Sequence, residues 1–246
     1  MAATAVACGG GAGALRSPST EPATIRGVAF DLFTVFDPRS GDAALREIFP
    51  TAGAGFPLAW RTRAFEHAWI RACAGRHLDF RHVLAEALVP IAAAEGIAPS
   101  EADIERAVAT LEHLTPWPDA REVLVALGDR GLRRTTLANF SPLMIERLLV
   151  NAGLDDVFDE RASTDEARTF KPDPRAYAVG ERVLDLPRAE IAFAAFGSWD
   201  AAGASWFGYP TFWVNRLGVA ADPLVAPGAT GPTLRELAVW LEEGAA

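Results

Sequence analysis

From residue 117 to the C-terminus, short apolar segments alternate with amphipathic segments of helical periodicity. Strands that are separated by helices pair in parallel, with the helices packed on both faces of the sheet. The alternation therefore predicts an α/β fold with a Rossmann-like parallel sheet. The expected strands are residues 132–137, 191–196 and 211–215, and the expected helices are residues 119–127, 142–151, 174–184, 200–207 and 233–241.

A separate helical block is inserted near the start of this pattern. Residues 26–33 are expected to contain a short apolar strand that ends at an acid, Asp31, and residues 42–112 then show helical periodicity throughout, with Ser100 as an N-cap candidate. A helical block placed after the first strand predicts a cap over the sheet. The expected domains are an α/β core formed by residues 25–40 and 117–246 and a helical cap domain at residues 41–116.

Composition narrows the classes of function. The net charge of −9 and the pI near 5.0 disfavour a nucleic-acid or anionic-membrane surface. Two cysteines without a CxxC pair favour a reducing compartment, so a cytoplasmic location is expected. The four histidines lack zinc-site spacing, and no apolar run has membrane-spanning length.

The first 24 residues are rich in Ala, Gly, Ser, Pro and Thr. Their apolar stretch is short and is interrupted by three consecutive glycines, unlike the core of a signal peptide. A disordered tail or a translation-start artefact is expected here, and an export sequence is the alternative.

Polar side chains stand where the expected strands end. Asp31 follows an apolar run, Asn139 follows the second strand, and Asp200 lies just past Phe196. A lone aspartate at a strand end is usually a turn or cap residue. Several polar residues at separate strand ends instead indicate a ligand site, because ligands bind beyond the carboxyl ends of parallel strands.

Lys171 is the single lysine among 23 basic residues, and all the others are arginine. A chain that uses arginine for every other cation can retain lysine where a compact ammonium is required. An ammonium can be buried beside carboxylates and can donate three hydrogen bonds. The alternative is a cation that survived by chance on a solvated loop.

These residues lie in segments that resemble the haloacid dehalogenase superfamily and, within it, the L-2-haloacid dehalogenases (type II). The resemblance extends from Arg26 to about Leu241 and rests on residues 30–37, 60–63, 137–142, 170–177, 199–204 and 207–216. It implies a haloacid dehalogenase-like core with a helical cap. It also implies hydrolytic dehalogenation of small 2-haloacids with no metal and no cofactor.

The resemblance implies a role for each matching residue. Asp31 would attack the halogen-bearing carbon, Lys171 would hold the Asp31 and substrate carboxylates, and Asp200 would orient Lys171 and help to activate water. The other catalytic residues implied are Arg61 and Asn139, which would cradle the halide, and Thr34, which would hydrogen-bond near Asp31. The substrate-binding residues implied are Leu32, Phe33, Thr62, Phe65, Phe80, Tyr177 and Trp199.

For two of these residues, a purely structural interpretation competes with the functional one. Arg61 could be a solvated arginine of the cap, and Phe65 could be ordinary core packing. The expected partners are a small halogenated carboxylic acid and a halide ion, with no nucleic acid and no membrane. A homodimer is expected from the family alone.

Several departures from the family pattern leave alternatives open. Phe33 stands where phosphatases of the superfamily carry a second aspartate, which disfavours a Mg²⁺-dependent phosphatase. The loop after Asp31 is one residue shorter than usual. Ala138, Ala195 and Gly197 stand where dehalogenases have serine, serine and asparagine. The alternative is thus a catalytically impaired member of the family that binds a small carboxylate.

Overall fold

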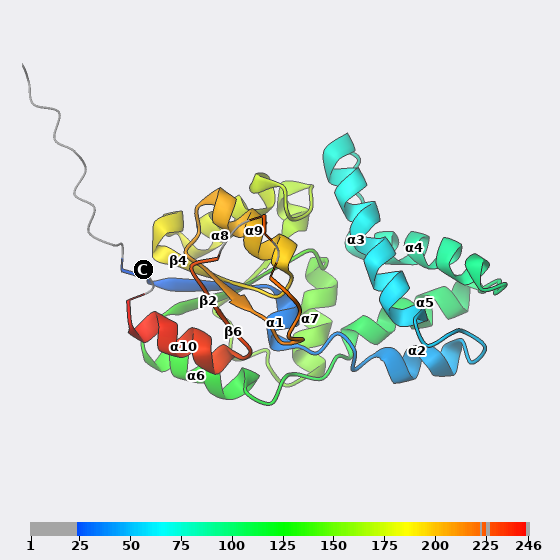
Figure 1. The fold of residues 1–246 in the computed structure, drawn as a ribbon, viewed down its shortest axis with the longest axis horizontal. Helices are drawn as coiled ribbons and strands as arrows, with labels where there is room; N and C mark the ends of the chain where they lie inside the picture. The colour runs from blue at the N-terminus through cyan, green and yellow to red at the C-terminus, as the bar shows by residue number, and fades with distance from the viewer. Residues whose placement is uncertain (1–23, 222, 225–226, 245–246) are drawn as a thin grey trace, which may run out of the picture.

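The computed structural model describes residues 24–221, 223–224 and 227–244. Its centre is a six-stranded parallel sheet with the strand order β3-β2-β1-β4-β5-β6 (Figure 1). The strands are β1 (Gly27–Phe30), β2 (Arg133–Ala138), β3 (Glu160–Ser163), β4 (Ile191–Ala195), β5 (Thr211–Val214) and β6 (Ala229–Gly231). The predicted α/β fold with a parallel sheet is confirmed.

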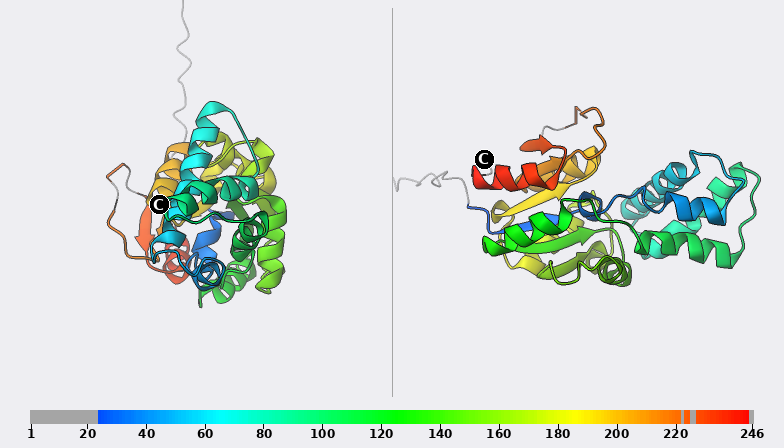
Figure 2. Two further views of the ribbon diagram at one scale, coloured as in Figure 1. Left: turned by 90° about the vertical axis from the view of Figure 1, so that its right-hand side faces the viewer. Right: turned by 90° about the horizontal axis from the view of Figure 1, so that it is seen from below.

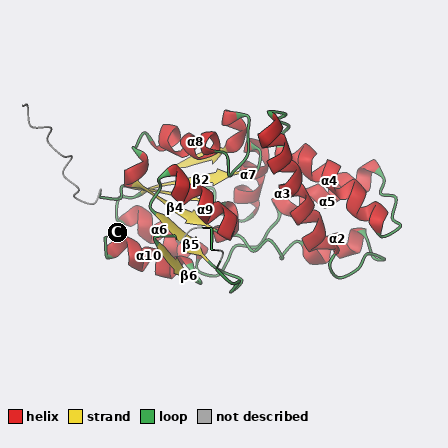
Figure 3. Ribbon diagram, turned by 45° about the horizontal axis from the view of Figure 1, so that its top comes forward, coloured by secondary structure: helices red, strands yellow, loops and turns green. Residues whose placement is uncertain are grey.

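Helices cover both faces of the sheet, as Figures 1 and 3 show. One face packs against α6 (Ala120–Asp129), α7 (Pro142–Asn151) and α10 (Leu234–Glu242), and the other against α8 (Pro174–Leu184) and α9 (Ser198–Phe207). The central strands β1 and β4 are fully buried, which explains their unbroken apolar sequence. Each large apolar side chain buried in this way stabilises the fold by roughly 1.5–3 kcal/mol.

Four further helices and a 3-10 turn form a separate module beyond the sheet (Figure 2). They are α2 (Asp42–Ile48), α3 (Phe56–Ala74), α4 (Phe80–Ala94), α5 (Glu101–Ala109) and the 3-10 turn η1 (Thr110–Glu112). The predicted N-cap is confirmed, because Ser100 and Asp103 form a capping box at the start of α5. The domain boundaries at residues 40/41 and 116/117 stay a prediction.

The first strand ends one residue before its predicted end at Asp31, and a short helix follows at once. This strand ends at Phe30, and α1 (Leu32–Val35) is a single helical turn with Asp31 as its N-cap. The Asp31 carboxylate accepts the N–H of Phe33, and the Thr34 hydroxyl donates to the Asp31 carbonyl. These local hydrogen bonds compete with the extended conformation that the apolar sequence favours.

The structure contains two strands and two short turns that the sequence did not predict. Both strands, β3 and β6, lie at the edges of the sheet, where less apolar surface is buried and the sequence pattern is weak. The turns are η2 (Thr164–Ala167) and η3 (Arg188–Glu190). Residues 1–23 lie outside the described residues, so the expected tail is not tested. Among the described helices, none is long and apolar enough to cross a membrane.

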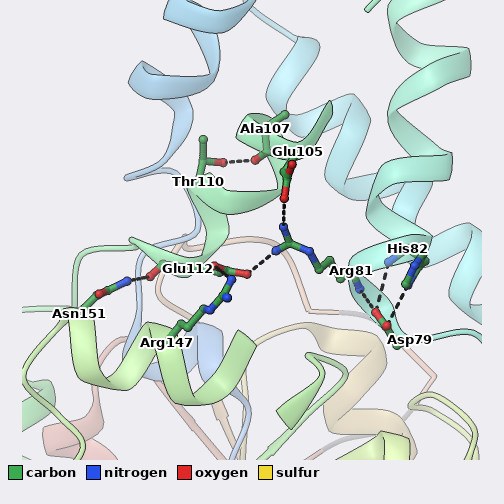
Figure 4. Close-up of polar contacts among 9 residues, drawn as sticks. All are labelled: Asp79, Arg81, His82, Glu105, Ala107, Thr110, Glu112, Arg147 and Asn151. Carbon is green, nitrogen blue, oxygen red and sulfur yellow. Dashed lines mark hydrogen bonds and ion pairs between the residues drawn. The ribbon is translucent and has the colours of Figure 1, made fainter. Parts of the chain in front are cut away.

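A buried carboxylate joins the helical module to the core (Figure 4). The Glu112 side chain is 5% exposed and accepts hydrogen bonds from Arg81 of α4 at 2.5 Å and from Arg147 of α7 at 3.0 Å. The Glu112 carbonyl accepts from Asn151, which also lies on α7. The two chain segments that connect the core to the helical module also pair with each other, through an antiparallel backbone bridge between Phe36 and Pro116. Glu112 therefore contributes to the angle between the module and the sheet.

We predict that Glu112→Gln destabilises the protein by roughly 1–3 kcal/mol, because it leaves both arginines without a buried charge partner. Glu105→Gln is the matched control, since Glu105 also pairs with Arg81 but is 76% exposed. This control should change stability by less than about 0.5 kcal/mol. Urea unfolding of both variants measures the difference, and equal effects would contradict an anchoring role for Glu112.

Candidate active site

The polar residues expected at strand ends meet at one edge of the sheet. The strands β2, β1 and β4 are neighbours and run in parallel, so their carboxyl ends open at the same edge. Asp31 follows β1, Asn139 follows β2, and Asp200 lies in the first turn of α9 after β4. Lys171 reaches the same place from the segment between η2 and α8.

The Lys171 ammonium lies between two carboxylates. Its Nζ is 2.8 Å from Asp31 Oδ1 and 2.8 Å from Asp200 Oδ2, and the residue is 1% exposed. Nζ also lies 5.2 Å from the ring centroid of Phe193. Burial acts to lower the pKa of Lys171, but the charges of Asp200 and Asp31 outweigh burial and raise this pKa above its ordinary value. The residue is thus a buried cation and not a solvated surface lysine.

Asp31 is held at both of its carboxylate oxygens but remains accessible. Oδ1 accepts from Lys171, and Oδ2 accepts the N–H of Phe33 at 3.0 Å. The side chain is 15% exposed and lines two adjacent cavities. The Thr34 hydroxyl contacts the backbone carbonyl of Asp31 at 2.6 Å and not the carboxylate. The arrangement presents an oriented, charged carboxylate to a cavity.

Asp200, the second carboxylate that binds Lys171, is buried. Its Oδ1 accepts from the Tyr177 hydroxyl at 2.7 Å, while Oδ2 binds Lys171. Burial, reinforced by the charge of Asp31, raises the pKa of Asp200 to about 6, although Lys171 and Tyr177 act to lower it. Tyr177 was expected to bind substrate, but it is fully buried and lines neither cavity. Its contact is with Asp200, whose carboxylate it orients.

The larger cavity has a volume of about 380 Å³ and lies between the sheet edge and α3. Among the expected site residues, its walls include Asp31, Phe33, Arg61, Thr62, Phe65, Trp199 and Asp200. The other lining residues are Pro38, Arg39, Asp42, Leu58, Phe196, Gly197 and Leu217. Such a concave space with a few convergent polar groups is the usual form of a small-molecule site.

A second cavity of about 10 Å³ adjoins the same carboxylate. It is lined by Asp31, Leu32, Phe33, Phe65, Phe80, Ala138, Asn139 and Phe140. Phe33 is common to both cavities and makes edge-to-face contacts with Phe65, Phe140 and Phe196. These rings surround Asp31 with apolar surface, which excludes water and strengthens electrostatic interactions at the carboxylate.

Arg61 and Asn139 are not brought to the same cavity. Arg61 lines the larger one and forms an ion pair with Asp42. Asn139 lines the smaller one. Its Oδ1 accepts hydrogen bonds from the backbone N–H of Lys171 at 3.0 Å and from the Thr164 hydroxyl at 3.3 Å. Its buried Nδ2 has no partner among the described residues. An unsatisfied buried donor of this kind is rare and is available to an anion beside Asp31.

The three positions that lack family side chains differ in their surroundings. Ala138 is 2% exposed and lines the small cavity. Ala195 is fully buried in a core cluster with Tyr177 and lines neither cavity. A Cβ atom on Gly197 would lie 2.6 Å from Trp199 Nε1, so the indole occupies the space of a side chain there. Only Ala138 combines a missing hydroxyl with adjacent free volume.

Sequence reasoning missed the residues that support the helical turn after Asp31. Arg216 is 4% exposed, donates twice to the Thr34 carbonyl, and pairs with Asp119 at 2.8 Å. The Trp117 indole N–H donates to the Phe33 carbonyl at 3.1 Å. Arg216 directly follows the expected strand at residues 211–215, and its place past a strand end was the available signal. The contact with α1 depends on tertiary packing.

No group of three or more His, Cys, Asp and Glu side chains suited to hold a metal ion occurs within residues 24–221, 223–224 and 227–244. The Asp31 carboxylate is instead bound by Lys171, and the Asp200 carboxylate is bound by Lys171 and Tyr177.

Comparisons with known proteins agree with this geometry. A family model for haloacid dehalogenase-like hydrolases matches residues 25–208. An (S)-2-haloacid dehalogenase of Xanthobacter autotrophicus is 38% identical over 194 residues, which cover 78% of this chain and 76% of that protein. Haloacetate dehalogenase H-2 of Moraxella sp. (strain B) is 34% identical over 212 residues, covering 85% and 95% of the two chains.

A solved structure extends the comparison to the fold. The L-2-haloacid dehalogenase of Xanthobacter autotrophicus with chloropropionic acid covalently bound superposes with a TM-score of 0.82 at 32% identity. The match covers 89% of this chain and 98% of the solved chain.

We predict that the Asp200 carboxyl titrates with a midpoint near pH 6. Tyr177→Phe should raise this midpoint further, because it removes a hydrogen bond to the carboxylate. Because the pKa of Asp200 in the wild-type protein is raised above its ordinary value of 3.8, the native protein binds this proton more tightly than the unfolded chain does. Its stability contribution from Asp200 should therefore fall as the pH rises from about 4 to 6. ¹³C NMR of labelled aspartate carboxyls, assigned with Asp200→Asn, measures the midpoint, and a value below 3.8 would contradict the prediction.

Proposed function

The chain belongs to the haloacid dehalogenase-like hydrolase family, and we propose that it hydrolyses small 2-haloacids to 2-hydroxyacids and halide. The observation that carries the proposal is Lys171 Nζ at 2.8 Å from both Asp31 and Asp200, which line a cavity of about 380 Å³. This arrangement holds a carboxylate in a fixed orientation next to the space that a substrate would occupy. A positioned carboxylate of this kind can act as a nucleophile toward carbon.

The first step would be displacement at C2 of the substrate. An oxygen of Asp31 forms a bond to C2 while the carbon–halogen bond breaks, and the halide leaves with the electron pair. Lys171 uses two of its three N–H donors on Asp31 and Asp200, and because it is 1% exposed and lines neither cavity, its part is to hold these two carboxylates rather than to bind the substrate. Two further donors face the cavities. The Nδ2 of Asn139, which has no partner among the described residues, lies at the small cavity, and the guanidinium of Arg61 lies at the large cavity.

The second step would be hydrolysis of the ester on Asp31. Water attacks the carbonyl carbon of Asp31, the 2-hydroxyacid leaves, and the carboxylate is regenerated with one oxygen from water. The negative charge that develops on the Asp31 oxygens is stabilised by Lys171 and by the Phe33 N–H. Asp200 holds Lys171 in place and assists removal of the water proton. The overall reaction releases one proton with each halide.

The residues around Asp31 also support independence from a metal. Phosphatases of the superfamily use an acid two residues after the nucleophile, and Phe33 occupies that position with its ring in the aromatic wall. A catalytically impaired protein that binds a small carboxylate is the second candidate. It is favoured by the missing hydroxyl at Ala138, which leaves the small cavity one donor short. A homodimer and a cytoplasmic location stay predictions.

We predict halide release from L-2-chloropropionate and haloacetates that is unchanged by EDTA and lost in Asp31→Asn. The loss should exceed about a thousandfold, because an amide cannot replace the carboxylate nucleophile. Single turnover in H₂¹⁸O should place the label on Asp31, as mass spectrometry of the peptide would show.

Thermal unfolding and intact mass of Asp31→Asn control for misfolding and for deamidation. A folded wild-type protein that releases no halide from these substrates would favour the carboxylate-binding candidate. Chelator-sensitive release of phosphate from a simple ester would instead place the chain with the phosphatases.

We predict that Ala138→Ser raises halide release or lowers the KM by a few-fold to roughly tenfold, about the worth of one hydrogen bond to a charged group. The adjoining cavity of about 10 Å³ is near the size of one water-sized probe, so a hydroxyl has room. Ala195→Ser is the matched control, because Ala195 is buried away from both cavities and should show no gain. Equal effects of the two substitutions would refute the specific role of position 138.

A further inference from the structure

An acidic residue lies on the wall of the large cavity, beside the arginine that the mechanism uses. Asp42 is the first residue of α2, and its Oδ1 accepts a hydrogen bond from Nη1 of Arg61 on α3. The two side chains are 17% and 11% exposed, so the pair is largely removed from solvent. Both residues line the cavity that also contains Asp31 and Asp200.

The ion pair engages only one end of the guanidinium. Among the described residues, Arg61 has no hydrogen bond or ion pair other than the one with Asp42. A guanidinium carries five N–H donors in a rigid fork. Asp42 therefore fixes the orientation of Arg61 while most of its donors remain available to the cavity.

Asp42 also changes the charge of the cavity. Lys171 and Arg61 balance Asp31 and Asp200, and Arg39 on the cavity wall is bound by Asp37 through its guanidinium. With Asp37 and Asp42 included, these groups carry four negative charges against the three positive charges of Lys171, Arg61 and Arg39, so Asp42 leaves the group with a net negative charge although it pairs with Arg61. In a site with restricted water, such a charge opposes an anion more strongly than it would in solvent.

The reaction proposed above produces an anion beside this pair. The leaving halide must be stabilised as the carbon–halogen bond breaks, and it must then depart before the next turnover. An unpaired, partly buried arginine favours the first event and delays the second. A carboxylate in contact with the arginine weakens its hold on a free halide, because the halide competes with the carboxylate for the same cation.

We propose that Asp42 is a positioning residue that controls halide release, by orienting Arg61 toward the substrate and by weakening its affinity for the halide product. This inference rests on the proposed function for its place in the reaction. The weakened halide affinity, however, is a property of the resting protein and can be measured without turnover.

The experiment is a chloride titration of the resting protein followed by ³⁵Cl NMR line broadening. Asp42→Asn retains an oxygen acceptor for Arg61 but removes the negative charge. It should tighten chloride binding by roughly three- to thirtyfold, as expected for one charge removed near the site. Arg61→Gln should abolish the binding. Glu66→Gln is the matched control, because Glu66 carries the same charge on α3 but pairs with Arg63 at an exposed position.

Propionate distinguishes a halide site from a general carboxylate site. In competition titrations, Asp42→Asn should change propionate binding less than chloride binding. With 2-chloropropionate as substrate, the same variant should show stronger product inhibition by added chloride, again relative to Glu66→Gln.

Chloride binding that is unchanged in Asp42→Asn, changed equally in Glu66→Gln, or absent from both the wild type and Asp42→Asn would overturn the inference. So would an equal or larger gain for propionate. Tighter chloride binding in a protein that releases no halide from 2-haloacids would retain the site and refute the proposed function instead. Thermal unfolding shows whether each variant is folded.

Discussion

The arrangement at the sheet edge depends on one buried ammonium. Lys171 is 1% exposed, and an ammonium in that environment is tolerated only because two carboxylates contact it. The contacts in turn require the end of β1, the first turn of α9 and the loop before α8 to meet within hydrogen-bond distance. Removing the cation would leave Asp31 and Asp200 close together without compensation. The same ion pairs that make a buried Lys171 tolerable therefore also fix the positions of the Asp31 and Asp200 carboxylates at the site.

The turn that follows Asp31 is supported from outside the cavity as well. This helical turn is too short to hold itself, and the carbonyls of Phe33 and Thr34 at its end are bound by Trp117 and Arg216. Arg216 is in turn fixed by Asp119. Rigid support of this kind reduces the reorganisation that is needed when charge develops in a transition state. The orientation of the Asp31 carboxylate is therefore a property of several elements together.

The helical module supplies the other half of the cavity. Its residues add apolar walls through Phe65 and Phe80 and add the Arg61–Asp42 pair. Glu112 connects this module to α7, so the position of these walls relative to Asp31 depends on the ion pairs of one buried carboxylate at the junction between the module and the core (Figure 4). Water exclusion and charge balance at the site both follow from this packing.

The sequence by itself determined the periodic features of this protein. Apolar strands alternating with amphipathic helices predicted the parallel sheet, and polar residues at strand ends predicted the meeting of Asp31, Asn139 and Asp200, because the carboxyl ends of parallel strands share one edge. The contact of Lys171 with Asp31 was predicted only from the resemblance to the family. The weakly apolar edge strands β3 and β6 escaped detection for want of such a pattern.

Only the tertiary structure decided which side chains from remote elements face one another. It placed Asp42 against Arg61, Tyr177 behind Asp200, the Trp199 indole in the space beside Gly197, and Arg61 and Asn139 in different cavities. These contacts depend on the angle between the helical module and the sheet and on side-chain packing, and neither quantity is encoded in local sequence periodicity.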